Sequence, residues 1–161
     1  MKRRPSRAPK PTYTMLDEMI ASPTEPTLPA TRRHQLTRMW EGLRSIELAP
    51  APSTEDWRVC SDAVNLMETL VSMGEVEDSS GLLPDAITAL ALAGKRHLKG
   101  STIRLDALGI QAVRAILEDY AAVLALLPAR TMVSCHRKTE RRLRDILAGK
   151  KQPHDVEVID L

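Results

Sequence analysis

The sequence predicts an all-α fold, a compact bundle of about five helices preceded by a short N-terminal helix. The first observation is the composition: the chain has no Phe, two Trp and two Tyr, whereas β-sandwiches depend on aromatic and β-branched residues. The second is that apolar residues recur at steps of three and four along five long segments. The third is that prolines gather between these segments. We expect one bundle domain at 31–149, with a flexible basic arm at 1–12, a short helix and Pro-rich linker at 13–30, and an extended tail at 150–161.

The charge of the chain is unevenly distributed, although the net value is only +2. Residues 1–12 carry +5, residues 13–129 carry −6, residues 130–151 carry +6 and the last ten carry −3. Such asymmetry points to charged partners. The chain has no apolar run long enough to cross a bilayer, and no apolar segment follows the basic N-terminus as in a signal peptide. We therefore expect a soluble, cytoplasmic protein with no membrane partner.

A short apolar face precedes the main bundle. Residues 14–22 place four apolar side chains on one side of a helix: Met15, Leu16, Met19 and Ile20. Pro23, Pro26 and Pro29 then end the helix. We expect this short helix to pack on the main body, and docking into a groove of a partner is the alternative.

The next three helices are predicted at 31–48, 53–73 and 82–99. Thr31 is the expected N-cap of the first, and Ser53 with Asp56 forms a capping box for the second. The helix at 53–73 carries two adjoining apolar stripes and so requires partners on two sides. Gly100 can adopt the left-handed conformation that ends the third helix.

The segment 106–127 is predicted to be the central, most buried helix, capped by Asp106 and stopped by Pro128. Its second half is apolar nearly all round, which is typical of burial or of an oligomer contact. The expected oligomer or partner contact residues are Ala121, Ala122 and Ala125. The expected core residues are Trp57, Leu66, Leu70, Leu90, Ile110, Val113, Leu117 and Leu124.

The helix at 129–148 has a thin apolar stripe and an opposite face rich in arginine. Such a helix can contact nucleic acid, an anionic membrane or an acidic protein, or it can be the solvated outer face of a bundle. The membrane is disfavoured because the apolar side has no Trp or Phe. Together with the N-terminal arm, the candidate contact residues are Lys2, Arg3, Arg4, Arg7, Lys10, Arg130, Arg137, Lys138, Arg141, Arg142, Arg144, Lys150 and Lys151. The tail beyond them could form a short strand beside 102–105 or could serve a partner as an acidic segment.

Motifs of known enzyme classes are missing from the sequence: there is no GxxxxGK[ST], GxGxxG, HExxH or GxSxG. Cys135 and His136 are neighbours, and neighbours on a helix point about 100° apart, so they cannot act unaided as nucleophile and base. Cys60 and Cys135 lie on separate helices and are expected to be buried small hydrophobes. We expect no catalytic residues, no cofactor and no metal. A metal site at Asp62, Asn65 and Glu68 is a minor alternative, because no His stands at ligand spacing.

Three stretches carry a resemblance: EDWRVCSDAVNLMETL at 55–70, GSTIRLDALGIQAVRAILEDY at 100–120 and TERRL at 139–143. With these, the chain resembles short proteins of proteobacterial phages, prophages and mobile elements that are often called "Fis family transcriptional regulators". The segment at 129–148 departs from the helix-turn-helix pattern of true Fis proteins. The resemblance implies a phage-type setting and transfers no functional residue.

From these observations we expect a non-enzymatic regulatory or adaptor protein of a phage or mobile element. It would bind a host protein, a phage protein or a second copy of itself in a homodimer, and its basic elements would add nucleic-acid affinity. A DNA-binding transcriptional regulator and a small helical enzyme of unfamiliar type are the alternatives.

Overall fold

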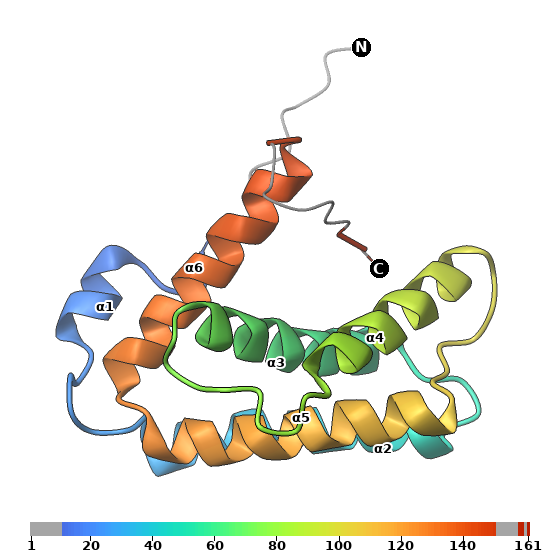
Figure 1. The fold of residues 1–161 in the computed structure, drawn as a ribbon, viewed down its shortest axis with the longest axis horizontal. Helices are drawn as coiled ribbons and strands as arrows, with labels where there is room; N and C mark the ends of the chain where they lie inside the picture. Colours follow the sequence, from blue (N-terminus) through green and yellow to red (C-terminus); the bar gives the residue numbers. More distant parts are fainter. Residues whose placement is uncertain (1–10, 151–157, 160) are drawn as a thin grey trace.

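The computed structural model describes residues 11–150, 158, 159 and 161, and its regular structure is helical apart from one isolated bridge between Pro26 and Pro128 (Figure 1). The predicted all-α fold is confirmed. The helices of this part of the chain are α1 (Met15–Ile20), α2 (Pro29–Leu48), α3 (Thr54–Ser72), α4 (Leu83–Leu98), α5 (Ala107–Leu126) and α6 (Ala129–Leu147).

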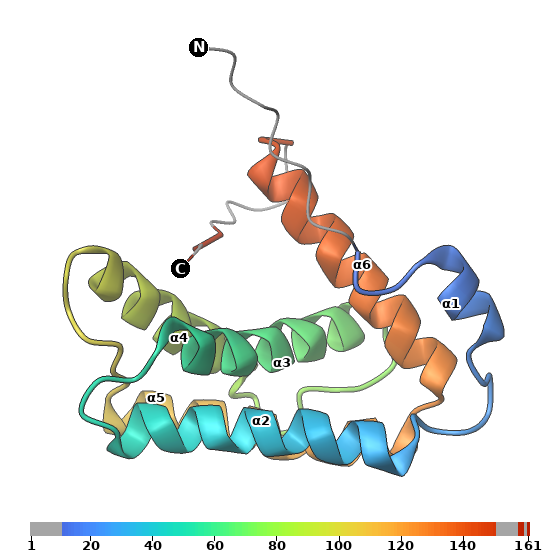
Figure 2. The same cartoon turned by 180° about the vertical axis from the view of Figure 1, so that it is seen from behind.

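The helices form two layers from which α6 projects. α2 and α5 lie side by side in one layer, and α3 and α4 cover them in the other (Figures 1 and 2). α6 packs against α3 and then rises away from both layers, and α1 lies against α6 (Figure 1). Within the described residues, no helix is both long enough and apolar enough to span a membrane.

The central helix is α3, so the prediction that the segment at 106–127 is the most buried is wrong. α3 contacts α2, α4, α5 and α6. It buries nine residues, against seven in α5. The physical reason is the width of its apolar surface: two adjoining stripes can face several neighbours at once. α5 instead leaves Ala122, Ala125 and Leu126 exposed at its end.

Local signals set most helix ends as predicted. The Ser53 hydroxyl accepts from the Asp56 amide at 3.1 Å, and the Asp56 carboxylate accepts from the Ser53 amide at 2.7 Å. Asp106 caps α5 through the Gly109 amide at 2.7 Å. α2 differs, because it begins at Pro29 and not after a Thr31 cap. Proline suits the first turn of a helix, where its missing N–H would have no intrahelical acceptor.

Seven of the eight predicted core residues are buried, and Ile110 is only half-buried. Ile110 lies about 60° around the helix from Val113, at the edge of the buried stripe of α5. Cys60 and Cys135 are both free and fully buried, as expected for small hydrophobic residues. Burial raises the pKa of each thiol to about 12, which keeps both in the unreactive protonated form.

The described part of the tail does not pair with 102–105. Ile159 packs on α4 instead: a Cβ added to Gly94 would lie 2.9 Å from Ile159 Cγ2 and 3.1 Å from Trp57 Cζ2. The strand predicted for the tail does not form at Val158 or Ile159. The rest of this prediction falls on residues 151–157 and 160, which lie outside the described residues.

Candidate functional site

The cations of α6 and of the residues just after it fall into two groups. Those of the first group form ion pairs or hydrogen bonds within the chain. Arg137 pairs with Glu18 of α1, and Arg142 pairs with Glu68 of α3. Arg130 donates to the carbonyls of Met19 and Ala21 in the α1 segment. Lys150 pairs with Asp145 at 2.7 Å. These four predicted contact residues are therefore engaged within the chain.

The second group is Lys138, Arg141 and Arg144, which are exposed and follow one another at steps of three. Their side chains form no ion pair or hydrogen bond with any residue that the structure describes. We call these three residues the basic face of α6. The remaining candidates lie outside the described residues: Lys2, Arg3, Arg4, Arg7, Lys10 and Lys151.

α1 is turned over relative to the prediction, with its apolar side facing outward. Its apolar residues are between 64% and 74% exposed: Met15, Leu16, Met19 and Ile20. None of the residues of α1 is buried. We call these four side chains the α1 ridge. The helix packs on the bundle as expected, but its apolar side is not the side in contact, because polar contacts with α6 fix the opposite side of the helix.

The polar contacts join the end of α1 and the residues after it to the start of α6. The Arg130 guanidinium donates to the Met19 carbonyl at 3.0 Å and to the Ala21 carbonyl at 3.2 Å. The backbone of the following linker is also bonded, since the Arg130 amide donates to the Ser22 carbonyl at 2.9 Å. These hydrogen bonds connect the linker after α1 to the start of α6, and together they fix the orientation of α1.

Two titratable groups stand at this junction. The hydrogen bond from Arg137 lowers the pKa of the Glu18 carboxyl. Burial lowers the pKa of His136, whose ring meets the Tyr13 ring edge-on at 5.2 Å between centroids. Both shifts favour the state near neutral pH, in which Glu18 is ionised and His136 is neutral.

An apolar groove of about 320 Å³ lies between α2 and α5. Leu36 and Trp40 line it from α2, and Ala121 and Ala125 line it from α5. We call this the α2–α5 groove. It brings together two of the three predicted partner-contact alanines, while Ala122 is exposed outside it.

Polar atoms near the groove lack partners. Arg32 lines the groove together with Arg33, and the Arg32 Nε atom is shielded from solvent without a hydrogen bond to any described residue. Gln35 Oε1, in the same part of α2, is also shielded and unbonded in the described structure. Unpaired buried polar atoms are unusual in proteins, so each of the two needs an explanation, and only Arg32 lines the α2–α5 groove itself.

The α1 ridge and the groove lie at the same end of the molecule, where α2 begins and α5 ends (Figures 1 and 2). Sequence periodicity identified the ridge residues and the alanines. It missed Leu36 and Trp40 as walls of the groove, because the period of an apolar pattern does not show which apolar residues of a helix are left at the surface.

The residues that the sequence suggested for metal binding or for catalysis make other contacts in the structure. The Glu68 carboxylate, considered for metal binding, accepts two hydrogen bonds from Arg142, at 2.8 and 3.2 Å. The Cys135 thiol donates to the Leu66 carbonyl at 3.3 Å in the core, while His136 faces Tyr13. The two neighbours therefore have separate environments.

Comparison of the chain with protein-family models, with curated proteins and with solved structures finds no match.

Proposed function

We propose that this chain is a non-enzymatic binding protein whose first partner is a second copy of itself. The α1 ridge of each copy would enter the α2–α5 groove of the other. The observation that carries this proposal is the orientation of α1, which exposes four large apolar side chains while polar bonds fix its other side. Exposed apolar clusters of this kind are typical of interaction sites.

A second copy is favoured over an unrelated protein because one chain carries both halves of the contact. The ridge is the apolar side of α1, which no described residue covers, and it is about 9 Å long at 1.5 Å per residue. The groove is an apolar trough without an occupant, lined by α2 residues from Pro29 to Trp40, which spans roughly 16 Å by the same rise. The methionines of the ridge can adapt to an irregular trough floored by alanines.

A two-fold arrangement also increases the surface area that the contact buries. One ridge of four side chains is small for a specific interface, which commonly buries about 1,200–2,000 Å² in total. Reciprocal exchange uses the ridge twice and places the same residues on both sides, as a symmetric dimer requires. A regulatory or adaptor role in a phage-type setting, implied by the sequence resemblance, is part of the same proposal.

Light scattering coupled to size exclusion tests the proposal. The wild type is expected at twice the 17.9 kDa of one chain. Ile20→Glu on the ridge and Ala125→Glu in the groove are each expected to give monomers, since both positions are exposed and tolerate charge in the free chain. Leu108→Glu, at a residue 76% exposed at the other end of α5, is the matched control and should stay dimeric. A monomeric wild type would overturn the proposal.

The basic face of α6 supports a second candidate function, affinity for nucleic acid. Lys138, Arg141 and Arg144 are exposed and have no acidic partner among the described residues. Unpaired cations on one helix can neutralise phosphates and release counterions, whatever the nucleotide sequence. We regard this affinity as an addition to protein binding.

A further inference from the structure

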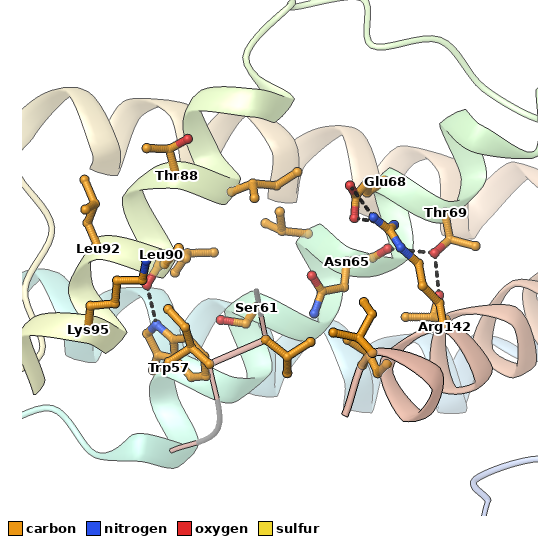
Figure 3. Close-up of a pocket in the computed structure, with 18 residues that line it drawn as sticks. Trp57, Ser61, Asn65, Glu68, Thr69, Thr88, Leu90, Leu92, Lys95 and Arg142 are labelled. Atoms are coloured by element: carbon orange, nitrogen blue, oxygen red, sulfur yellow. Dashed lines mark hydrogen bonds and ion pairs between the residues drawn. The ribbon is translucent and has the colours of Figure 1, made fainter. Parts of the chain in front are cut away.

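A second cavity, of about 440 Å³, lies between α3, α4 and α6 (Figure 3). It belongs to the other layer of the fold and shares no residue with the α2–α5 groove. Apolar side chains form most of its wall, among them Trp57, Leu90, Ile146 and Ile159. Its volume falls within the range of about 300–1,000 Å³ that is usual for small-molecule sites.

One line of polar side chains runs along the α3 wall of this cavity. Ser61, Asn65 and Glu68 follow at steps of four and three, which places them on one face of the helix. The Glu68 end of this line is already occupied, because its carboxylate accepts both bonds from Arg142 (Figure 3). The positions open to a ligand are therefore Ser61 and Asn65.

Ser61 is the exception among the buried polar groups of the cavity. Its residue is 8% exposed, and its hydroxyl has no hydrogen-bond partner among the described residues. Its polar neighbours are satisfied: the Trp57 indole donates to the Leu90 carbonyl at 2.9 Å, and the hydroxyls of Thr69 and Thr139 bond at 2.6 Å. A buried hydroxyl without a partner needs an explanation, and a ligand supplies one.

We infer that this cavity binds a neutral amphipathic small molecule, with an elongated apolar body and one amide-type group that hydrogen bonds to Ser61 and Asn65. Ser61 and Asn65 can each both donate and accept, which matches the N–H and C=O of an amide. A charged head group is disfavoured because it would lose its hydration, while Glu68 and Arg142 already neutralise each other and Lys95, the other charged residue of the wall, is also engaged within the chain.

The shape of the cavity indicates an elongated ligand. The α3 residues that line it run from Trp57 to Thr69, roughly 18 Å along the helix axis at 1.5 Å per residue. The polar pair lies within this length, between Trp57 on one side and the Glu68–Arg142 pair on the other (Figure 3). Apolar parts of the ligand would therefore extend from the amide along Trp57, Leu90 and Ile146.

Calorimetric titration of the full chain with decanamide tests this inference, with decanoate as the charged counterpart. We expect decanamide to bind in the micromolar range and decanoate to bind at least tenfold more weakly. Ser61→Ala is expected to weaken decanamide binding about tenfold, yet to raise the Tm of the free protein, because it removes an unpaired buried hydroxyl. Ala91→Leu, which adds volume to the cavity wall, should abolish binding.

Thr69→Val is the matched control. Its hydroxyl is in the same wall but is already bonded to Thr139 and to the Asn65 carbonyl. This variant should lower the Tm and leave decanamide affinity within about twofold. Absence of decanamide binding, unchanged affinity in Ser61→Ala, or equal binding of decanoate would each overturn the inference. The result is independent of the proposed dimer, because none of these variants lies on the ridge or in the groove.

Discussion

Glu18 of α1 and Arg137 of α6 form an ion pair that joins positions 119 residues apart. Both side chains are largely covered, with 28% and 20% of their surface exposed. The pair fixes the polar side of a six-residue helix against α6. Because a helix has opposite sides, fixing the polar side turns Met15, Leu16, Met19 and Ile20 outward.

Removing this ion pair should release α1 without unfolding the bundle. We expect Arg137→Gln to increase amide hydrogen exchange in α1, while the exchange of α3 and α5 stays the same. The loss of global stability should be about 1 kcal/mol or less, since the pair is partly exposed. Exchange measured by mass spectrometry checks this.

The control for the ion pair is Arg141→Gln, which removes the same charge from the basic face of the same helix. It should leave α1 protected. Exchanging the two charges, as in Glu18→Arg with Arg137→Glu, should restore much of the protection. If α1 exchanges equally fast in the wild type and in Arg137→Gln, the ion pair is not what orients the helix.

Acid should loosen α1 in two steps. Burial lowers the pKa of His136 below its ordinary 6.5, so the unfolded state binds the proton first and stability falls as pH drops below about 6.5. The Arg137 hydrogen bond lowers the pKa of Glu18 below its ordinary 4.5. Its contribution is therefore complete above about pH 4.5 and is lost as pH falls through the lowered value.

Hydrogen exchange of α1 between about pH 7 and about pH 3, corrected for the intrinsic pH dependence of exchange, covers both steps. His136→Gln should remove the upper step and keep the lower one. Glu18→Gln should remove the lower step. An α1 that keeps the same protection throughout this range would show that neither group contributes to its anchoring.

Gly42 lies where α2 approaches α3 closely, and Gly42→Ala should destabilise the fold although Ala is the better helix former. An added Cβ would lie 2.4 Å from a methyl carbon of the partly buried Val59 and 2.9 Å from the Asp56 carbonyl oxygen. The propensity gain of about 1 kcal/mol should be exceeded by an overpacking cost of about 1–3 kcal/mol. Urea unfolding measures the difference. His34→Ala, at an exposed position of α2 outside the groove, is the control, and a more stable Gly42→Ala would show that the two helices can move apart freely.

The basic face of α6 should give salt-dependent binding to duplex DNA. Replacing Lys138, Arg141 and Arg144 by Glu should abolish binding at moderate salt. Fluorescence anisotropy at several salt concentrations measures this, and about three lost phosphate contacts should reduce the slope of log K against log salt by roughly 2–3. Arg137 is not part of this variant, because its loss would also free α1.

A triple replacement with the same charge change elsewhere is the control. The chosen residues are exposed cations on other helices or their caps: Arg44, Arg58 and Lys99. This variant should retain most of the DNA affinity. If both triple variants lose affinity equally, only the net charge matters and the basic face has no special role.

Local features of the fold could be predicted from sequence because their causes lie within a few residues. The Ser53–Asp56 capping box and the Asp106 cap are each set by residues three positions apart. Apolar periodicity placed the helices and nearly all of the predicted core for the same reason. The Ile110 exception shows that periodicity locates a stripe better than its edges.

The orientation of α1 could not be predicted in this way. Its apolar pattern favours burial, and the contacts that oppose burial come from Arg130 and Arg137, more than a hundred positions away. For a related reason, the sequence did not predict that α3 is more buried than α5. Total apolar content favours α5, whereas the number of helices that a surface can face favours α3.

Mixing the two monomeric variants tests the central claim most directly. Ile20→Glu retains an intact groove and Ala125→Glu retains an intact ridge, so a mixture can form one of the two reciprocal contacts. Sedimentation velocity of the equimolar mixture should show a heterodimer, weaker than the wild-type dimer, that neither variant forms alone. If the mixture stays monomeric while the wild type is a dimer, the α1 ridge does not enter the α2–α5 groove and the dimer is built from other surfaces.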